Sequence, residues 1–459
     1  MSSVVMFLLG VIVVVLGIAV SVGVHEFGHL LAAKAFGIKV TKYFIGFGPT
    51  IWSHRWGETE YGLKWIPLGG FCSIAGMYPS ANEPASRAST DADPASDPTS
   101  DAPAAERRGV ATAVAANALD MGEPELAPGE EHRAFYRAPI WQRLCVMLGG
   151  IMGNVLLTIV FFSASMMGIG VAELTPQLSS VSQCVLPETS SQTTCTDDDA
   201  LSPGAEAGLQ PGDTILSIDG TAISSWDEVT AAFQDSAGVA LDLVIERDGE
   251  QLSVTVSPIA TLRYVYAEDG SVQTDADGTA LTHTVGFVGV SPSTEFVPQS
   301  FGTVLSTTWD YAGQVAAAVV TLPEKVVGVV ESMLTDEERS TDSPLSVVGV
   351  GRVAGEVASS SALSFEAKAA TVLSLLGALN LSLAMFNVIP LLPLDGGHAA
   401  GAIWEGIRRG WARMRRRPDP GPFDASRLLP VTTVVTVLLL VMGGVLILSD
   451  VFDPISLFG

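Results

Sequence analysis

Four long apolar runs dominate the pattern of hydrophobic and polar positions along the chain. Each is about as long as the roughly 20 residues that an α-helix needs to cross the hydrocarbon core of a bilayer. The runs cover residues 4–32, 144–170, 370–388 with a continuation to 394, and 428–448. The first has no Lys or Arg before it and no small-residue cleavage site behind it, so we interpret it as a span and not as a signal peptide. The pattern predicts an α-helical polytopic membrane protein with about four transmembrane helices.

The composition supports this prediction and excludes a single compact soluble domain. Of the 459 residues, 48% are hydrophobic and only 16% are charged, and the mean hydropathy is +0.39. The polar segments between the runs are long enough to form soluble parts.

The basic residues predict the orientation of the spans. Lys and Arg gather between the first two spans and again between the last two, where the run comprises Arg408, Arg409, Arg413, Arg415, Arg416 and Arg417. Both segments should therefore be cytoplasmic, with both termini facing outward. A basic run can bind nucleic acid or anionic lipid headgroups. The net charge of −25 argues against nucleic acid, so the lipid bilayer is the predicted partner.

The segments around the first two spans differ sharply in composition. Residues 1–78 should join the first span to a membrane-associated β region, because residues 39–75 alternate aromatic and aliphatic positions with glycine-rich turns. Residues 79–132 are mostly Ala, Pro, Ser, Asp and Glu, which predicts a disordered cytoplasmic insertion. The second span then falls within residues 133–172, and the last two fall within residues 369–459.

The clearest landmark outside the spans is a run that begins at Ala207 and reads A-G-L-x-P-G-D-x-I-L-x-I-x-G. This run resembles a PDZ domain, in which Pro211 and Gly212 would turn the chain into an alternating strand. No G-L-G-F-type loop precedes Ala205. The resemblance implies an inserted extracytoplasmic PDZ (α+β) domain over residues 173–262.

Residues 263–368 are expected to form an extracytoplasmic linker with an amphipathic region. Within them, residues 301–330 are rich in Ala and Val but include Asp310, Glu324 and Lys325. These charges favour a helix on the outer membrane surface over a fifth span.

The four cysteines divide between the two predicted compartments. Cys72 and Cys145 fall on the cytoplasmic side, and Cys184 and Cys195 fall outside. An oxidising exterior favours a disulfide between Cys184 and Cys195, and two free thiols are the alternative.

The first apolar run contains the sequence His25-Glu26-Phe27-Gly28-His29. On an α-helix, residues four apart share a face, so both imidazoles can bind one zinc ion with Glu26 beside them. The alternative is a helix whose polar residues cap it or face water. Three ionisable groups are costly in hydrocarbon unless they share a partner, which favours the metal.

Catalytic zinc usually takes three protein ligands and one water, so a distant third ligand is needed. Asp395 is the best candidate, because it follows the third span at the predicted cytoplasmic end, where the first span also ends. Without the two histidines, a turn-forming Asp before Gly396 and Gly397 would be the simpler explanation. His54, His132, His283 and His398 show no metal-ligand spacing and receive no role.

Together the two motifs resemble the site-2 protease family, whose signature pairs H-E-x-x-H with N-x-x-P-x-x-x-L-D-G in a later helix. Here the second motif is Asn387, Pro390, Leu394, Asp395 and Gly396. With the PDZ-like insertion and the order of spans, the chain looks most like the bacterial branch that contains the regulator-of-sigma-E protease. The acidic insertion over residues 79–132 departs from that pattern.

The resemblance implies an intramembrane zinc metalloendopeptidase of the bacterial plasma membrane. His25, His29 and Asp395 would bind Zn²⁺, Glu26 would be the catalytic residue, and Asn387 would hold the substrate backbone. A polar helix-packing residue would look the same as Asn387 in sequence. The stretch from Gly149 to Asn154 resembles the family's Gly-x-x-x-Asn sequence, and we interpret it as close helix packing.

The implied substrates are single-span membrane proteins such as anti-sigma factors or signal-peptide remnants. A membrane-tethered PDZ adaptor with a non-catalytic metal site is the alternative. A cation transporter is a weaker one, because it would need further acidic or His residues along several spans.

Overall fold

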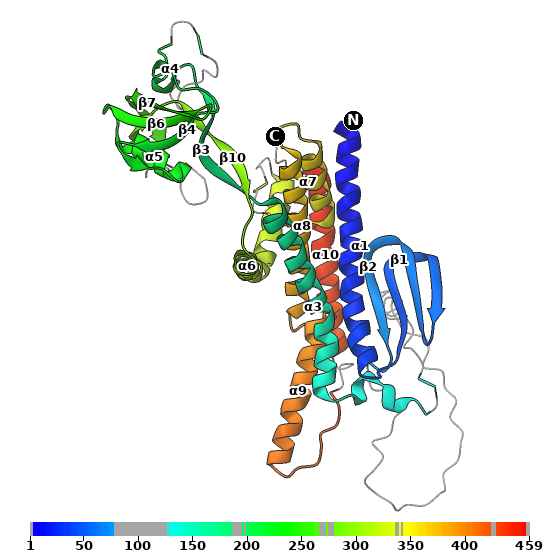
Figure 1. The fold of residues 1–459 in the computed structure, drawn as a ribbon. Coiled ribbons are helices and arrows are strands. Elements are labelled where there is room, and N and C mark those ends of the chain that lie inside the picture. Colours follow the sequence, from blue (N-terminus) through cyan, green and yellow to red (C-terminus); the bar gives the residue numbers. More distant parts are fainter. Residues whose placement is uncertain are drawn as a thin grey trace, which may run out of the picture. The chain divides into compact units, whose positions relative to one another are not determined.

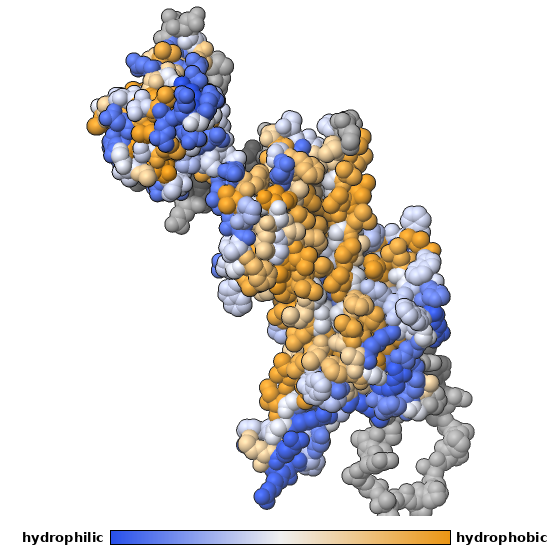
Figure 2. Space-filling model, in the orientation of Figure 1, coloured by the Kyte–Doolittle hydropathy of each residue, from blue (hydrophilic) through white to orange (hydrophobic). Residues whose placement is uncertain are grey.

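The computed structural model describes residues 3–77, 126–127, 129–185, 195–196, 199–265, 272–273, 280–335, 339–340, 343–423 and 428–455. The chain forms two compact units, one of Met1–Gly168 with Gln299–Gly459 and one of Ile169–Pro298. We call them the membrane unit and the inserted unit. Figure 2 shows a nearly continuous hydrophobic surface over the helices of the membrane unit, whereas the inserted unit has a mixed surface.

Three helices form the centre of the membrane unit (Figure 1). They are α1 (Ser3–Ala35), α3 (Ile140–Ser163), which continues into the π-helical segment η3 (Ala164–Ile169), and α8 (Phe365–Val388). Helices α1 and α3 run antiparallel and touch backbone to backbone. A Cβ on Gly28 or Gly149 would lie within 3.0 Å of the other helix, so both positions need glycine. This contact brings the H-E-x-x-H turn of α1 directly against α3.

Five helices in the described part of the chain are long and apolar enough to cross a bilayer. Four correspond to the expected spans, and the last of them is α10 (Leu429–Phe452). The fifth, α6 (Phe301–Leu334), is the segment expected on the outer surface. Both ends of α6 form hydrogen bonds at one and the same end of the helix bundle. The backbone N–H of Gln299 donates to Met166 O at the end of η3, and Ser332 Oγ donates to Asp453 Oδ2 after α10.

The third predicted span ends earlier than expected. Helix α8 stops at Val388 instead of continuing to residue 394. Pro390 and Pro393 interrupt it, since proline has no N–H for the helix ladder. A separate helix, α9 (Asp395–Met414), then begins at Asp395, and the apolar pattern did not reveal it because α9 is amphipathic.

A buried carboxylate near the C-terminal end of α10 joins this helix to Arg339 and to the start of α7 (Val347–Ser359), which packs against the first half of α1. Arg339 Nη1 donates to Asp450 Oδ1 at 2.8 Å, and both side chains are almost fully buried. The other carboxylate oxygen of Asp450 accepts the backbone N–H groups of Ser346 (2.6 Å) and Gly349 (3.1 Å). One carboxylate therefore neutralises the arginine and caps the start of α7.

The predicted β region is a hairpin of two long, bulged strands, β1 (Val40–Trp56) and β2 (Thr59–Ile74). Residues 40–45 of β1 pair with residues 70–74 of β2 on one side and with residues 59–63 on the other. Residues 70–74 therefore form an edge of this sheet. Several large side chains on the hairpin are exposed, among them Trp52, Trp56 and Trp65, as expected for contact with lipid.

Residues 79–125 and 128 of the expected insertion lie outside the described residues. The prediction of disorder up to residue 132 is wrong at its end, because Glu131–Arg133 form the 3₁₀ helix η1. Glu130 pairs with Lys39, and Arg133 forms two hydrogen bonds with Glu58 at 2.7 and 2.8 Å. These bonds also hold the pKa of Glu58 below its usual value.

The inserted unit is built on a six-stranded sheet and a helix. The strand order is β10-β3-β4-β6-β7, and β5 pairs with β4. The elements are β3 (Val171–Val181), α4 (Pro203–Glu206), β4 (Thr214–Ile218), β5 (Thr221–Ala222), α5 (Trp226–Asp235), β6 (Leu241–Arg247), β7 (Glu250–Val256), β8 (Ile259–Tyr264), β9 (Thr282–Phe287) and β10 (Val290–Val297). Leu178, Ile215, Leu243 and Ile245 lie in its core.

The expected boundary at residue 262 is corrected by this topology. The compact unit extends to Pro298, because β9 pairs with β8 and β10 pairs with β3 along its whole length. Residues 263–298 therefore belong to the inserted unit and not to a linker. Val171 lies opposite Val297, so the chain enters and leaves the unit through neighbouring strands.

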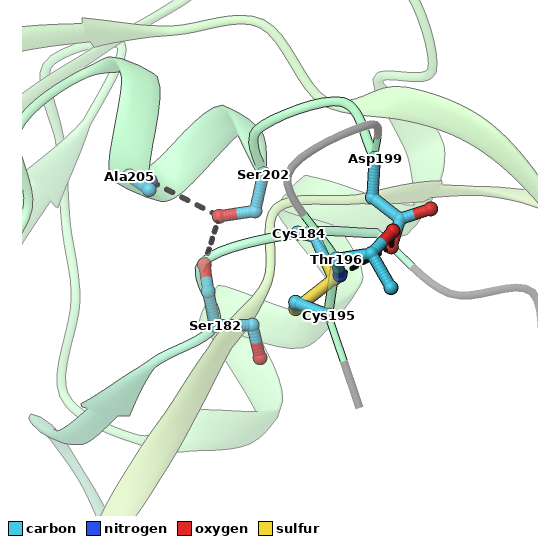
Figure 3. Close-up of a disulfide and its surroundings, with 7 residues drawn as sticks. All are labelled: Ser182, Cys184, Cys195, Thr196, Asp199, Ser202 and Ala205. Atoms are coloured by element: carbon cyan, nitrogen blue, oxygen red, sulfur yellow. Dashed lines mark hydrogen bonds between the residues drawn. A yellow bond between two sulfur atoms is a disulfide. The ribbon is translucent and has the colours of Figure 1, made fainter. Parts of the chain in front are cut away.

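Cys184 and Cys195 are joined by a disulfide in the inserted unit (Figure 3). Beside it, Ser202 Oγ donates to Ser182 O and accepts the backbone N–H of Ala205, which caps α4. Thr196 bonds Asp199 through both its N–H and its hydroxyl. The remaining cysteines, Cys72 and Cys145, are free thiols.

Candidate metal centre

Two distant segments bring three ligand atoms together. His25 Nε2 and His29 Nε2 are 3.2 Å apart on one face of α1. Asp395, the first residue of α9, places Oδ2 3.1 Å from His25 Nε2 and 3.2 Å from His29 Nε2. Both histidines are buried. Within the residues that the structure describes, this is the one group of His, Cys, Asp and Glu that could hold a metal ion.

The triangle of ligand atoms fits zinc. With Zn–N and Zn–O bonds of about 2.0–2.1 Å and tetrahedral angles, neighbouring ligand atoms stand roughly 3.3 Å apart. The observed separations are 3.1–3.2 Å. Asp395 Oδ2 is buried and has no protein hydrogen-bond donor, which suits an atom whose partner is a metal. Two imidazoles and one carboxylate are also a ligand set of catalytic zinc that leaves a fourth position open.

The tautomer of His29 is fixed by α3. His29 Nδ1 lies 2.8 Å from Val146 O, and a carbonyl oxygen can only accept, so Nδ1 carries the proton. The lone pair of His29 is then on Nε2, the atom that faces His25 and Asp395. This arrangement of a metal-ligand histidine held by a backbone carbonyl is common in zinc sites.

Asn154 can fix the tautomer of His25 in a similar way. Its buried side-chain amide lies 3.2 Å from His25 Nδ1, and its Oδ1 has no partner. A half-turn of the amide lets Oδ1 accept from Nδ1–H and leaves Nε2 free for a metal. The sequence predicts close helix packing for the Gly149–Asn154 stretch, and the structure adds that Asn154 contacts His25.

Glu26 lies beside the ligands and is not one of them. It lines a cavity of about 220 Å³ together with His29 and Asp395. The other lining residues are Gly70, Phe71, Cys72, Ile74, Met77, Met147, Pro393 and His398. The cavity is therefore bounded on one side by residues 70–74, the edge of the β sheet.

The structure places His398 and Asn387 differently from what the sequence predicts. His398, to which we gave no role, lines this cavity. It is three residues after Asp395 and shares its helix face, a signal that is visible once α9 is known to be a helix. Asn387 is not among the lining residues, and its Nδ2 donates to Leu383 O at 3.0 Å within α8.

Comparison with protein families agrees with this geometry. Residues 13–417 match Peptidase family M50. The chain belongs to Peptidase family M50. This is the site-2 protease family that the two motifs predicted, so the chain is a zinc metalloprotease and a multi-pass membrane protein.

Several M50 relatives resemble the chain over nearly its full length. It is 33% identical over 461 residues to zinc metalloprotease Rip1 of Mycobacterium tuberculosis, covering 99% of this chain and 100% of the relative. It is 31% identical over 474 residues to Rip1 of Mycolicibacterium smegmatis, again covering 99% and 100%. Metalloprotease MmpA of Caulobacter vibrioides is 25% identical over 435 residues, which cover 92% of this chain and 90% of that one.

Proposed function

We propose that this M50 protease cuts single-span membrane proteins within or beside their transmembrane helices, with His25, His29 and Asp395 as its zinc ligands. The observation that carries the proposal is the convergence of these three ligand atoms beside Glu26, at one end of apolar helices. A PDZ adaptor with a structural metal would not need a carboxylate in the cavity. The test is to measure zinc content and cleavage on the same preparations of the wild type and of variants at Glu26 and Asp395.

Each residue of the site has a distinct task in peptide hydrolysis. Zinc supplies Lewis acidity, which lowers the pKa of a coordinated water to about 7 and polarises the scissile carbonyl. Glu26 takes the proton from the attacking water and returns it to the leaving amine nitrogen. Val146 O and Asn154 keep the two imidazoles in the metal-binding tautomer. Asn387 would hold the substrate backbone after its amide turns away from Leu383 O.

The substrate helix must unwind before its peptide group can reach Glu26, because helical carbonyls are already bonded and shielded. The edge formed by residues 70–74 offers replacement hydrogen bonds by strand addition next to the cavity. Residues of this edge line the cavity, and an edge strand leaves every second N–H group unpaired, so alternate N–H groups of this edge are available to a substrate strand.

Proline substitutions placed singly at residues 70–74 should therefore impair cleavage at alternate positions, because proline removes a backbone donor and every second donor faces the substrate. Cleavage of a single-span substrate in detergent, normalised to zinc content, measures the effect. The same scan over residues 50–56, on the opposite edge of the sheet, is the control and should leave cleavage intact. An equal loss at every position from 70 to 74 would contradict strand addition.

The proposed setting is the bacterial plasma membrane, with the zinc site near the cytoplasmic side and the inserted unit outside. The positions of Lys and Arg support this orientation. Helix α6, whose two ends meet the outer ends of η3 and α10, would lie along the outer surface. Anti-sigma factors and signal-peptide remnants are the substrate classes that the family resemblance implies.

We propose that the inserted unit is a PDZ domain that excludes substrates with bulky outer domains. It contains a groove of about 590 Å³ between α5 and residues 283–292, and the run Gly286-Phe287-Val288-Gly289 lies in its wall. This G-L-G-F-like sequence follows the core motif, whereas no such loop precedes Ala205. The groove could therefore also bind a substrate C-terminus, and an experiment has to separate this docking role from exclusion.

Joining Gly170 to Pro298 through a short Gly-Ser linker should allow cleavage of substrates that keep a large outer domain. The paired ends of β3 and β10 make this excision short and unstrained. Cleavage of matched substrates with and without an outer domain is compared in cells. Thr230→Trp, which fills the groove and keeps the bulk of the domain, is the control and should change nothing. Loss of all cleavage in both variants would establish docking instead of exclusion.

A further inference from the structure

A fully buried carboxylate lies far from the cavity on the helix that carries Asp395. Glu405 is 0% exposed and stands ten residues after Asp395 in α9, roughly 15 Å along the helix axis. Its Oε1 lies 2.7 Å from Nη2 of Arg143 in α3, and the side chain of Arg143 is 6% exposed. Hydrolysis at the zinc site has no use for this ion pair, and a buried pair is costly to keep without a specific role.

The pair is a specific polar link between α9 and α3. The other residues that α9 buries are all small: Gly396, Ala399, Ala402 and Ala412. Small side chains allow close approach but fix neither the rotation nor the sliding of a helix. Glu405 also accepts the backbone N–H of Phe423 at 2.9 Å and lies 3.0 Å from Arg409, which is itself part of α9 and one-third exposed. Of these contacts, the one with Arg143 connects the two helices.

One face of α3 contacts both histidines and also the helix that carries Asp395. Arg143, Val146, Gly150 and Asn154 follow each other at helical spacing, and all are buried. Val146 and Asn154 contact the two histidines, and Gly150 packs against both rings. Arg143 is the member of this face that reaches the helix of the third ligand.

The other end of α9 is fixed as well. A Cβ on Gly396 or Gly397 would lie within 3.0 Å of the backbone at residues 388–392, so the first turn of α9 sits tightly on the end of α8. A helix is stiff over ten residues. The position of Asp395 therefore depends both on the contact of Gly396 and Gly397 with the end of α8 and on the pair of Arg143 and Glu405.

We infer that Arg143 and Glu405 form a positioning pair that sets Asp395 against His25 and His29 and so raises the zinc affinity of the site. The inference rests on the proposed zinc ligands. The pair touches neither substrate nor metal, and acts by holding α9 in register on the helix that also orients both histidines.

The test measures metal binding by the purified full-length protein in detergent after removal of zinc with a chelator. Zinc affinity is obtained by competition with a chromophoric chelator, and the absorption spectrum of bound Co²⁺ reports the ligand set. Glu405→Gln should bind zinc about tenfold more weakly, at the lower end of the effect of removing groups that orient metal ligands. Its cobalt spectrum should move toward that of Asp395→Ala, which lacks the third ligand.

Arg409→Gln is the matched control, because it removes the other arginine near Glu405 without touching the link to α3; it should keep wild-type affinity and spectrum. If Glu405→Gln does not fold, Arg143→Lys keeps the charge, loses the guanidinium geometry and should still weaken zinc binding. The positioning role is overturned if Glu405→Gln keeps the wild-type zinc affinity and cobalt spectrum. Where Arg143→Lys has to replace that variant, the same result in Arg143→Lys overturns it. Wild-type zinc affinity in Asp395→Ala would instead overturn the ligand set itself.

Discussion

Replacing Glu26 by alanine will abolish peptide-bond cleavage and leave the zinc content unchanged, whereas replacing Asp395 by alanine will remove both. Glu26 lines the cavity but contributes no atom to the ligand triangle, so its loss removes the proton carrier and not the metal. General acid–base groups contribute about 10²–10⁴-fold to rates, which puts residual activity of Glu26→Ala below detection in most membrane assays. Asp395 supplies one of three ligand atoms, and two histidines alone bind zinc weakly.

The measurement is zinc per protein by atomic absorption, together with cleavage of a single-span substrate by the same preparation. Glu26→Gln should behave like Glu26→Ala, because the amide keeps the shape and loses the basicity. Glu366→Ala, an exposed glutamate in the first turn of α8, is the matched control and should retain both zinc and activity. Full zinc and full activity in Asp395→Ala would show that the third ligand lies elsewhere.

Gly150→Ala is expected to weaken zinc binding almost as much as the removal of a ligand does. A Cβ at this position would lie 2.8 Å from His25 Nε2 and closer still to His29 Nε2, where the metal must be bound. The methyl group cannot turn aside, and α3 cannot retreat, because Gly28 and Gly149 hold it against the backbone of α1. We expect zinc affinity to fall roughly a hundredfold, in the range seen when ligand orientation is disturbed.

Gly168→Ala provides the control for this experiment. Gly168 belongs to the same continuous helical segment, and a Cβ there would meet nothing within 4 Å, so the variant should keep wild-type zinc content and cleavage. Thermal unfolding of the chelator-treated proteins separates loss of metal from loss of fold. Wild-type zinc binding by Gly150→Ala would mean that the two imidazoles stand further from α3 than the structure places them.

The convergence of His25, His29 and Asp395 could be predicted from sequence because the motifs that contain them are short and local. Residues His25 and His29 are one helical turn apart, and the later L-D-G motif stands at the end of an apolar run. The sequence also indicated the β region and the segment from 301 to 330 as a helix. These features depend on periodicity and composition, which a single sequence displays directly.

Other features depend on which helix faces meet, and no local pattern displays that. Asn154 reads as an ordinary polar residue in a small-residue stretch until α1 and α3 are packed against each other. His398 could be placed only once α9 was known to begin at Asp395. The end of the inserted unit was likewise hidden, since β10 returns to pair with β3 more than one hundred residues earlier in the chain.

The buried pair of Arg339 and Asp450 imposes an order on the assembly of the protein. Asp450 lies near the end of α10, more than one hundred residues after its partners, which belong to the segment from Arg339 to Gly349. Until α10 has been made, Nη1 of Arg339 and the N–H of Ser346 lack this carboxylate, and burying a charged group without its counter-ion is costly. This end of the bundle is therefore stabilised only after α10 is complete, so a chain cut before Asp450 should pack α7 against α1 less firmly.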